Sequence, residues 1–141
     1  MESLSDLDVM TATVWGEARG EARVGQVAVA WVIRNRAENP RWWGRNIREV
    51  CLKSYQFSCW NPNDPNYKKI ISPDLKKEFN YSLIREVCQE VLDADKSQDL
   101  SNNADHYCVT SIIHLVKWAK GKTPVALIGH HSFFRLELFA L

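Results

Sequence analysis

The chain has 141 residues, of which 45% are hydrophobic and 25% charged, and this composition fits a single globular domain spanning residues 1–141. Its 18 basic and 17 acidic residues leave a net charge of +1, which gives no bulk argument for nucleic-acid binding. No apolar run reaches the ~18 residues of a membrane span, and no basic segment starts a signal peptide. We therefore expect synthesis in the cytoplasm, without membrane insertion.

The first two predicted elements are helices at residues 4–17 and 22–37. Apolar residues recur in both at helical spacing, and the wide apolar belt of the second indicates burial on most sides. Ser3 and Ser5 are credible N-caps for the first helix. Gly20 is expected to end it soon after Glu17.

The rest of the chain predicts shorter elements. Asn46 can cap a helix over 47–52 after a loop, and the segment 55–67 is rich in turn formers. Ser72-Pro73-Asp74 predicts a helix that runs to about residue 94, with a break expected near Asn80. Residues 104–110 and 125–128 favour extended structure, whereas 112–119 fit a short helix or a strand equally. The class is mainly α with a little β.

Two glutamates four residues apart, Glu17 and Glu21, lie between the first two helices. A carboxyl group buried where helices meet suits general acid catalysis, because burial raises a carboxyl pKa towards neutrality. Flanking glycines let a ligand or another backbone approach Glu17 closely. The alternative for Glu17 is a solvated helix end. Glu21 is explained more simply as an acid in the first turn of the second helix.

The loop Gln56-Phe57-Ser58-Cys59-Trp60 combines aromatic rings and polar side chains. Such loops bind sugars, because C–H faces stack on rings and hydroxyls need donors and acceptors. The alternative, in which these aromatics fill the core, fits equally well.

The histidines and cysteines form no metal-binding pattern, so we expect no metal or other cofactor. His106, beside Tyr107, is a better candidate for a cleft than His114 or His130, for which structural roles are expected. The spacing of the four cysteines favours free, buried thiols over a disulfide or a zinc site.

Several motifs together resemble the SleB/CwlJ-type cell-wall hydrolases over roughly residues 14–134. They are Trp15–Glu21, Gly25–Ala30, Asn35-Arg36, Gln56–Ser58, Ile128–Phe133, and His106-Tyr107 with the later Trp118. The variants Trp42-Trp43-Gly44 and Cys59-Trp60-Asn61-Pro62 resemble the phage and prophage branch of this family.

The resemblance implies an α+β, lysozyme-like fold, with helices around a buried central helix and a small β or extended region lining the cleft. It implies a lytic transglycosylase that cleaves the MurNAc–GlcNAc bond of peptidoglycan, with Glu17 as acid and then base. Substrate-binding residues are expected at Glu21, Gln56, Phe57, Ser58, Trp60, His106, Tyr107, Trp118 and His131. No metal is needed for this route.

Other interpretations stay open. A muramidase would recruit Glu21 or Asp64 as a second carboxylate. A non-catalytic wall-binding virion protein would keep the fold without the reaction, and an amidase would need zinc or a nucleophile that the sequence does not display. We expect a monomeric endolysin or virion-associated lysin that acts on the bacterial cell wall, released by a holin or carried by the virion.

Overall fold

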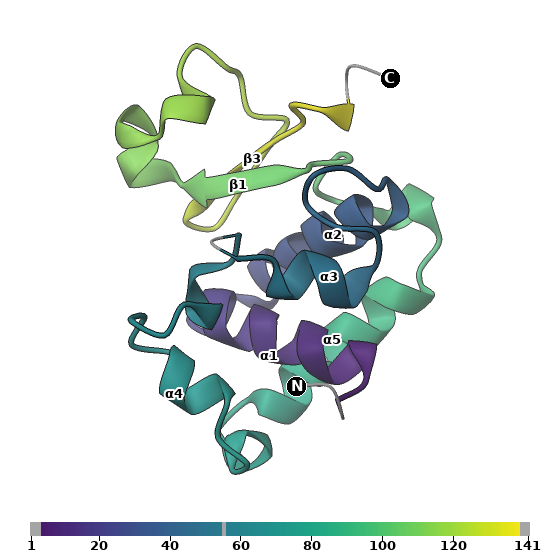
Figure 1. Ribbon diagram of the computed structural model, residues 1–141. Coiled ribbons are helices and arrows are strands. Elements are labelled where there is room, and N and C mark those ends of the chain that lie inside the picture. The colour runs from purple at the N-terminus through teal and green to yellow at the C-terminus, as the bar shows by residue number, and fades with distance from the viewer. Residues whose placement is uncertain (1–3, 55, 139–141) are drawn as a thin grey trace.

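Two layers, a group of helices and a small sheet, make up the computed structural model, which describes residues 4–54 and 56–138 (Figure 1). The α-helices are α1 (Asp6–Ala18), α2 (Arg23–Glu38), α3 (Ile47–Leu52), α4 (Tyr67–Ile70) and α5 (Tyr81–Asp93). Short 3₁₀ turns are η1 (Ser58–Trp60), η2 (Leu75–Lys77), η3 (Lys96–Gln98), η4 (Thr110–Leu115) and η5 (Lys117–Ala119). The strands are β1 (His106–Val109), β2 (Ala126–Ile128) and β3 (His131–Phe134).

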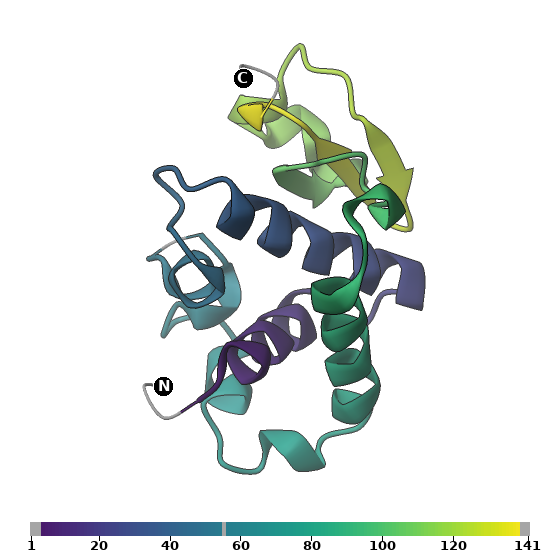
Figure 2. The same cartoon turned by 90° about the vertical axis from the view of Figure 1, so that its right-hand side faces the viewer.

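Helix α2 is the buried centre of the fold, as its wide apolar belt predicts. It packs against α1, α3 and α5 on one side and against β1 and β2 on the other. Figure 2 shows it lying between the sheet and the other long helices. Trp31 and Ile33 are fully buried in this position. The mainly helical, α+β, lysozyme-like class predicted from the sequence is confirmed.

The helix ends follow the local capping signals. Ser5 caps α1 in a capping box, with its hydroxyl accepting from the Asp8 N–H at 3.1 Å. Asn46 caps α3 and accepts from the Glu49 N–H at 2.9 Å. Helix α1 ends at Ala18, so Glu17 lies in its last turn, as predicted.

The sheet is antiparallel with strand order β1-β3-β2. Tyr107 pairs with Phe133, and His106 pairs with Phe134. Behind β1, the turns η4 and η5 enclose a second small core made by Cys108, Ala119 and Phe134. The sheet therefore has one side towards the helices and one towards these turns.

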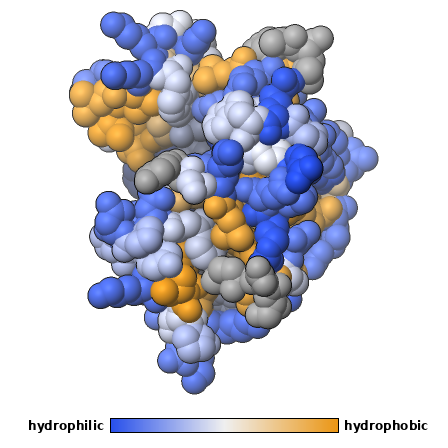
Figure 3. All heavy atoms as spheres, in the orientation of Figure 1, coloured by the Kyte–Doolittle hydropathy of each residue, from blue (hydrophilic) through white to orange (hydrophobic). Residues whose placement is uncertain are grey.

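Three predictions about elements were wrong or incomplete. Ser72-Pro73 does not start a long helix: only the turn η2 forms, and α5 starts after Asn80, where the break was expected. Helix α4 was not predicted. The segment 112–119 is neither α-helix nor strand but two 3₁₀ turns, and its apolar side chains Ile112 and Leu115 are exposed. In Figure 3 apolar surface covers this part of the molecule at the upper left.

Candidate active site

Glu17 is held by donors from two segments that are distant in the sequence. Its Oε2 accepts from the backbone N–H of Cys59 at 3.2 Å and from the Ser58 hydroxyl at 3.4 Å. Its Oε1 accepts from the Tyr107 hydroxyl at 3.0 Å. The helical layer thus supplies two donors and the sheet supplies the third, which fixes the carboxyl group between the two layers.

Gly16 allows the loop that carries these donors to reach α1. A Cβ atom at Gly16 would lie 2.7 Å from Cys59 Cβ and 2.9 Å from its Sγ, closer than real contacts. Two hydrogen bonds add to this packing: Asn66 Nδ2 donates to the Gly16 carbonyl at 3.1 Å, and Trp60 Nε1 donates to Thr13 Oγ1 at 2.9 Å. The glycine before Glu17 is therefore required by a close approach, as its position suggested, and the group that approaches is the Cys59 side chain.

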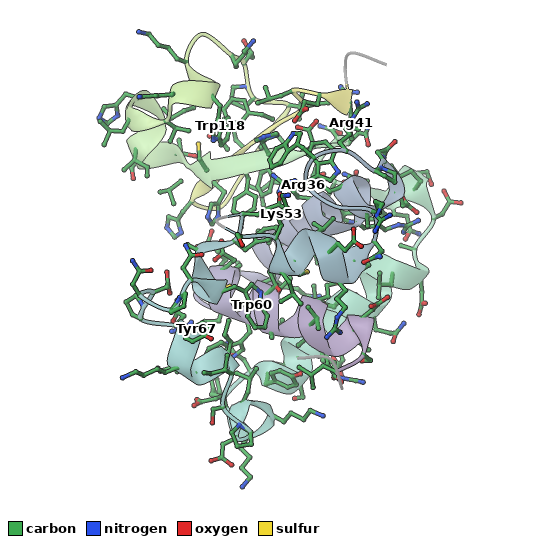
Figure 4. The ribbon with its side chains drawn as sticks, viewed as in Figure 1. Arg36, Arg41, Lys53, Trp60, Tyr67 and Trp118 are labelled. Carbon is green, nitrogen blue, oxygen red and sulfur yellow. The ribbon has the colours of Figure 1, made fainter. Side chains whose placement is uncertain are left out.

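Glu17 opens into a cleft of about 570 Å³ between the helices and the sheet. The residues that line it are Glu17, Arg36, Trp42, Ser54, Gln56, Phe57, His106, Tyr107 and Trp118. Figure 4 labels Trp118 on the sheet side, with Arg36 and Lys53 nearer the helices. A cleft with rings on its walls and few charges fits a chain of sugars.

Most of the predicted site residues come together here. Gln56, Phe57, His106, Tyr107 and Trp118 line the cleft with Glu17, and Ser58 bonds to Glu17 directly. The remaining predicted binding residues do not line it: Trp60 is turned towards Thr13, and Glu21 and His131 lie behind Tyr107.

Gln56 and Phe57 have more than one role. The amide of Gln56 donates to the carbonyls of Val50 and Trp43, at 2.6 and 3.2 Å, and so ties the loop to α3. Phe57 is 2% exposed and belongs to the main core. Core packing is therefore observed for Phe57, whereas sugar contact by this loop stays a prediction.

Arg36, which the sequence did not single out as a site residue, forms the floor of the cleft. Its Nε donates to the Asp105 carbonyl at 2.7 Å, and its guanidinium lies 5.5 Å from the Trp43 ring and 5.6 Å from the Phe57 ring. Burial lowers the pKa of Arg36 to about 10, so the side chain stays cationic at neutral pH. It places a fixed positive charge at the cleft.

Asp105 anchors the wall that carries His106. Its carboxylate lies 2.8 Å from His106 Nδ1 and accepts from the backbone N–H groups of Leu136, Glu137 and Leu138. Burial alone would raise the pKa of Asp105, but these donors outweigh it and hold the pKa at about 2. The ring of His106 then faces Trp118, with centroids 4.9 Å apart.

Tyr107 stays a neutral donor to Glu17. Burial raises the pKa of Tyr107 well above its ordinary value, and the neighbouring Glu17 charge acts in the same direction. Its ring packs against His131 and Phe133, with centroids 5.3 and 5.7 Å away. These contacts fix the hydroxyl over the carboxyl group.

The carboxylate of Glu21 makes hydrogen bonds with the hairpin between β2 and β3. Its oxygens lie 2.7 Å from His130 Nδ1 and 3.1 Å from His131 Nδ1, and Oε1 also accepts from the His130 N–H. Burial raises the pKa of Glu21, but the His130 hydrogen bonds and the two histidine charges outweigh it and lower the pKa. Glu21 thus connects the start of α2 to the sheet.

The four cysteines are free and buried, as the sequence favoured. Burial raises the pKa of Cys51 and Cys88 to about 12, so neither is a thiolate at neutral pH. Among residues 4–54 and 56–138, no group of three or more histidine, cysteine or acidic side chains is arranged to hold a metal ion. Over the same residues no helix is long and apolar enough to cross a membrane.

Comparisons with known proteins agree with the resemblance. A family model described as Cell Wall Hydrolase matches residues 20–134. The spore cortex-lytic enzyme of Halalkalibacterium halodurans is 32% identical over 133 residues, which cover 92% of this chain but 34% of that protein. The chain thus spans about a third of the length of this curated relative, and the aligned range includes Glu17. No solved structure matched. The chain belongs to the cell wall hydrolase family.

Proposed function

We propose that the protein degrades peptidoglycan as a lytic transglycosylase, with Glu17 as the general acid and base. One observation carries the proposal: among the described residues that line the cleft, Glu17 is the single carboxyl group. A transglycosylase needs one such group, whereas a two-carboxylate hydrolase needs a partner across the scissile bond. Glu21, one of the two alternative partners, is engaged with two histidines.

The proposed reaction uses Glu17 twice. Its protonated carboxyl group gives a proton to the oxygen that joins N-acetylmuramic acid to N-acetylglucosamine, and the bond from that oxygen to C1 of the muramic acid breaks. The muramic acid 6-hydroxyl then bonds to C1 and closes a 1,6-anhydro ring. The hydroxyl proton returns to the Glu17 carboxylate, so the enzyme is restored without water being consumed.

The surrounding residues have supporting roles in this scheme. The Cys59 N–H and the Tyr107 hydroxyl hold the carboxyl group in one orientation, so that its proton is aimed at the bound sugar. The rings of Trp42, His106 and Trp118 form walls on which sugar faces can stack. Glu21 and Asp64 are not assigned a catalytic part.

The test is the loss of turbidity of purified sacculi. We expect Glu17→Gln to keep the melting temperature of the wild type but to lose activity by at least about 10³-fold, within the range of general acid–base catalysis and charge stabilisation. Glu78→Gln, in an exposed turn, is the matched control and should keep full activity. Full activity in Glu17→Gln would refute the proposal.

Mass spectrometry of the products separates the alternatives. Anhydro-muramic ends support the transglycosylase, whereas reducing ends indicate a muramidase and would direct attention to Glu21→Gln and Asp64→Asn. Free stem peptides with a new N-terminal amine, and lactyl groups left on the sugar, indicate an amidase. Binding to sacculi without any product indicates a wall-binding virion protein.

The biological setting that we propose is a phage or prophage lysin that reaches the wall after synthesis in the host cytoplasm. The motifs around Trp42 and Cys59, which resemble the phage branch, support this setting. Expression in a bacterial host should cause lysis only when a holin or a permeabilising agent opens the membrane. Lysis without membrane opening would contradict this route.

A further inference from the structure

The turns η4 and η5, behind β1, pack on the sheet through one row of apolar side chains. Side chains three residues apart lie on the same side of a 3₁₀ turn, and the burial of this segment follows that period. Ile113, Val116 and Ala119 belong to the second small core of the sheet. This inner row accounts for the packing of the segment, so its other sides are free to be polar.

A second row of the same segment is apolar and yet exposed. Ile112 is 44% exposed, Leu115 70% and Trp118 38%. The proposed function explains the exposure of Trp118, because its ring lines the cleft, whereas Ile112 and Leu115 are not among the residues that line it. Single exposed apolar residues are ordinary, but several together mark a binding surface. Figure 3 shows this apolar surface at the upper left, with hydrophilic side chains beside it.

Lysine side chains accompany the exposed apolar row. Lys117, Lys120 and Lys122 are all exposed, and none of them forms an ion pair with another residue that the structure describes. The sequence from residue 106 to residue 136 contains no aspartate or glutamate, although the whole chain has 17 acidic residues. Positive charge is therefore concentrated here, on a chain whose net charge is +1.

We propose that this exposed surface, which we call the η4–η5 surface, binds an anionic lipid bilayer. It consists of Ile112, Leu115, Lys117, Lys120 and Lys122. The apolar side chains enter the boundary between headgroups and acyl chains, while the lysine ammonium groups stay level with the lipid phosphates. Such binding takes place on one face of the membrane and needs no spanning helix. It goes beyond the proposed function and does not depend on it.

Other occupants match only half of the η4–η5 surface. In a symmetric dimer of this chain, each copy would present the same lysines to the other, without acids in the segment to pair with them. An anionic wall polymer would pair with the lysines but would leave Ile112 and Leu115 in water. An anionic bilayer offers phosphates and acyl chains in one surface, so it satisfies both kinds of side chain.

The test is sedimentation with sucrose-loaded vesicles, which contain no glycan. One set contains phosphatidylglycerol and phosphatidylcholine in equal parts, and the other contains phosphatidylcholine alone. The variants are Ile112→Ser/Leu115→Ser and Lys117→Gln/Lys120→Gln/Lys122→Gln. The matched controls change exposed residues elsewhere and are Phe79→Ser/Leu83→Ser and Lys68→Gln/Lys69→Gln/Lys76→Gln. Because all these side chains are exposed, every variant should keep the melting temperature of the wild type.

The wild type should bind the anionic vesicles about 10²-fold more tightly than the neutral ones, since each lysine near such a surface contributes about fivefold. Salt at about 1 M should remove most of this difference. The lysine variant should bind both sets equally. The apolar variant should lose about 10- to 100-fold on the anionic vesicles, because its two side chains no longer transfer apolar surface out of water. Both controls should bind as the wild type does.

Equal binding of the wild type to both sets, binding to neither, or losses as large in the controls as in the variants would overturn the inference. So would sedimentation velocity that shows a dimer, dissociated by Ile112→Ser/Leu115→Ser, without vesicle binding. Binding confined to sacculi that retain teichoic acid would identify a wall polymer as the occupant and would also overturn it. None of these results bears on Glu17, whose role is judged by cleavage of sacculi.

Discussion

Replacing Gly16 by alanine tests how the Glu17 carboxyl group is positioned. The new Cβ would lie 2.7 Å from Cys59 Cβ, 2.9 Å from Cys59 Sγ and 3.4 Å from Ile70 Cγ2. Because Gly16 is held within α1, the loop at Cys59 has to move away. The same loop carries the N–H and hydroxyl donors to Glu17, so the movement lengthens their hydrogen bonds.

The cost in stability is small compared with the cost in activity. Overpacking of this kind costs about 1–3 kcal/mol. Alanine regains about 1 kcal/mol of helix propensity over glycine. The net loss of about 0–2 kcal/mol corresponds to a melting temperature lower by up to about 10 °C. A displacement of about 1 Å at a catalytic group costs about 10²-fold in rate, so activity should fall well beyond the loss of folded protein.

The assay combines thermal unfolding with initial rates on sacculi. Gly20→Ala is the matched control: nothing lies within 4 Å of its new Cβ, so it should be neutral or slightly stabilising and fully active. Adding Cys59→Gly to Gly16→Ala removes both clashing atoms and should restore part of the activity. If Gly16→Ala keeps full activity, or if Cys59→Gly restores none, the close contact does not position Glu17.

Three further predictions concern the residues around Glu17. Tyr107→Phe removes the donor to Glu17 Oε1, a hydrogen bond to a charged group worth about 1.5–3 kcal/mol. The kcat should therefore fall about 10- to 100-fold with KM nearly unchanged. A change confined to KM would contradict this. Glu21 raises the pKa of His130 above 6.5, so the stability from this pair is present below pH 6.5 and is lost as pH rises through the folded pKa. His130→Ala should therefore lower the melting temperature at pH 6 but not at pH 9, and an equal loss at both values would count against the pair. Folding lowers the pKa of Asp105 from 3.8 to about 2, which corresponds to about 2 kcal/mol in the free energy of unfolding. This contribution is present above pH 3.8 and is lost as the pH falls towards 2. Asp105→Asn should be less stable in urea at pH 7, with the difference narrowing below pH 3, and a constant difference would refute this account.

The sequence predicts the long helices and their ends because their signals are local. The apolar belt of α2 and the cap at Ser5 act through neighbouring residues, and both are observed. The start at Ser72-Pro73 fails because contacts from α1 compete with it. Trp15 Nε1 donates to the Phe79 carbonyl, and Asn80, at φ 61°, donates to the Arg19 carbonyl. Such contacts join residues more than 60 apart and leave no local pattern.

The site, like the fold, has parts that the sequence predicts and parts that depend on long-range contacts. The resemblance named Tyr107 and Ser58 as substrate-binding residues, but their hydrogen bonds to Glu17 were not predicted and could not be derived from spacing. Arg36 and Trp42 were missed as cleft residues, although one signal was available. Arg36 falls three residues after Ile33 on the buried face of α2, and a cation on an apolar face requires partners. Which partners it finds depends on how β1 folds back over α2.

The two glutamates that look equivalent in the sequence acquire different environments because α1 ends between them. Glu17 is still helical and points into the cleft, where it meets a backbone N–H and two hydroxyls. Glu21 lies beyond the helix end and meets the hairpin, where Gly129, at φ +57°, would bring a Cβ within 2.9 Å of its Oε1. His131 is on β3, which pairs with the strand that carries Tyr107, so Glu21 contacts the same sheet that donates to Glu17. Glu21 therefore has a structural contact with the sheet, whereas Glu17 is the single carboxyl group among the described residues that line the cleft. This difference fits the proposed reaction, which needs one acid.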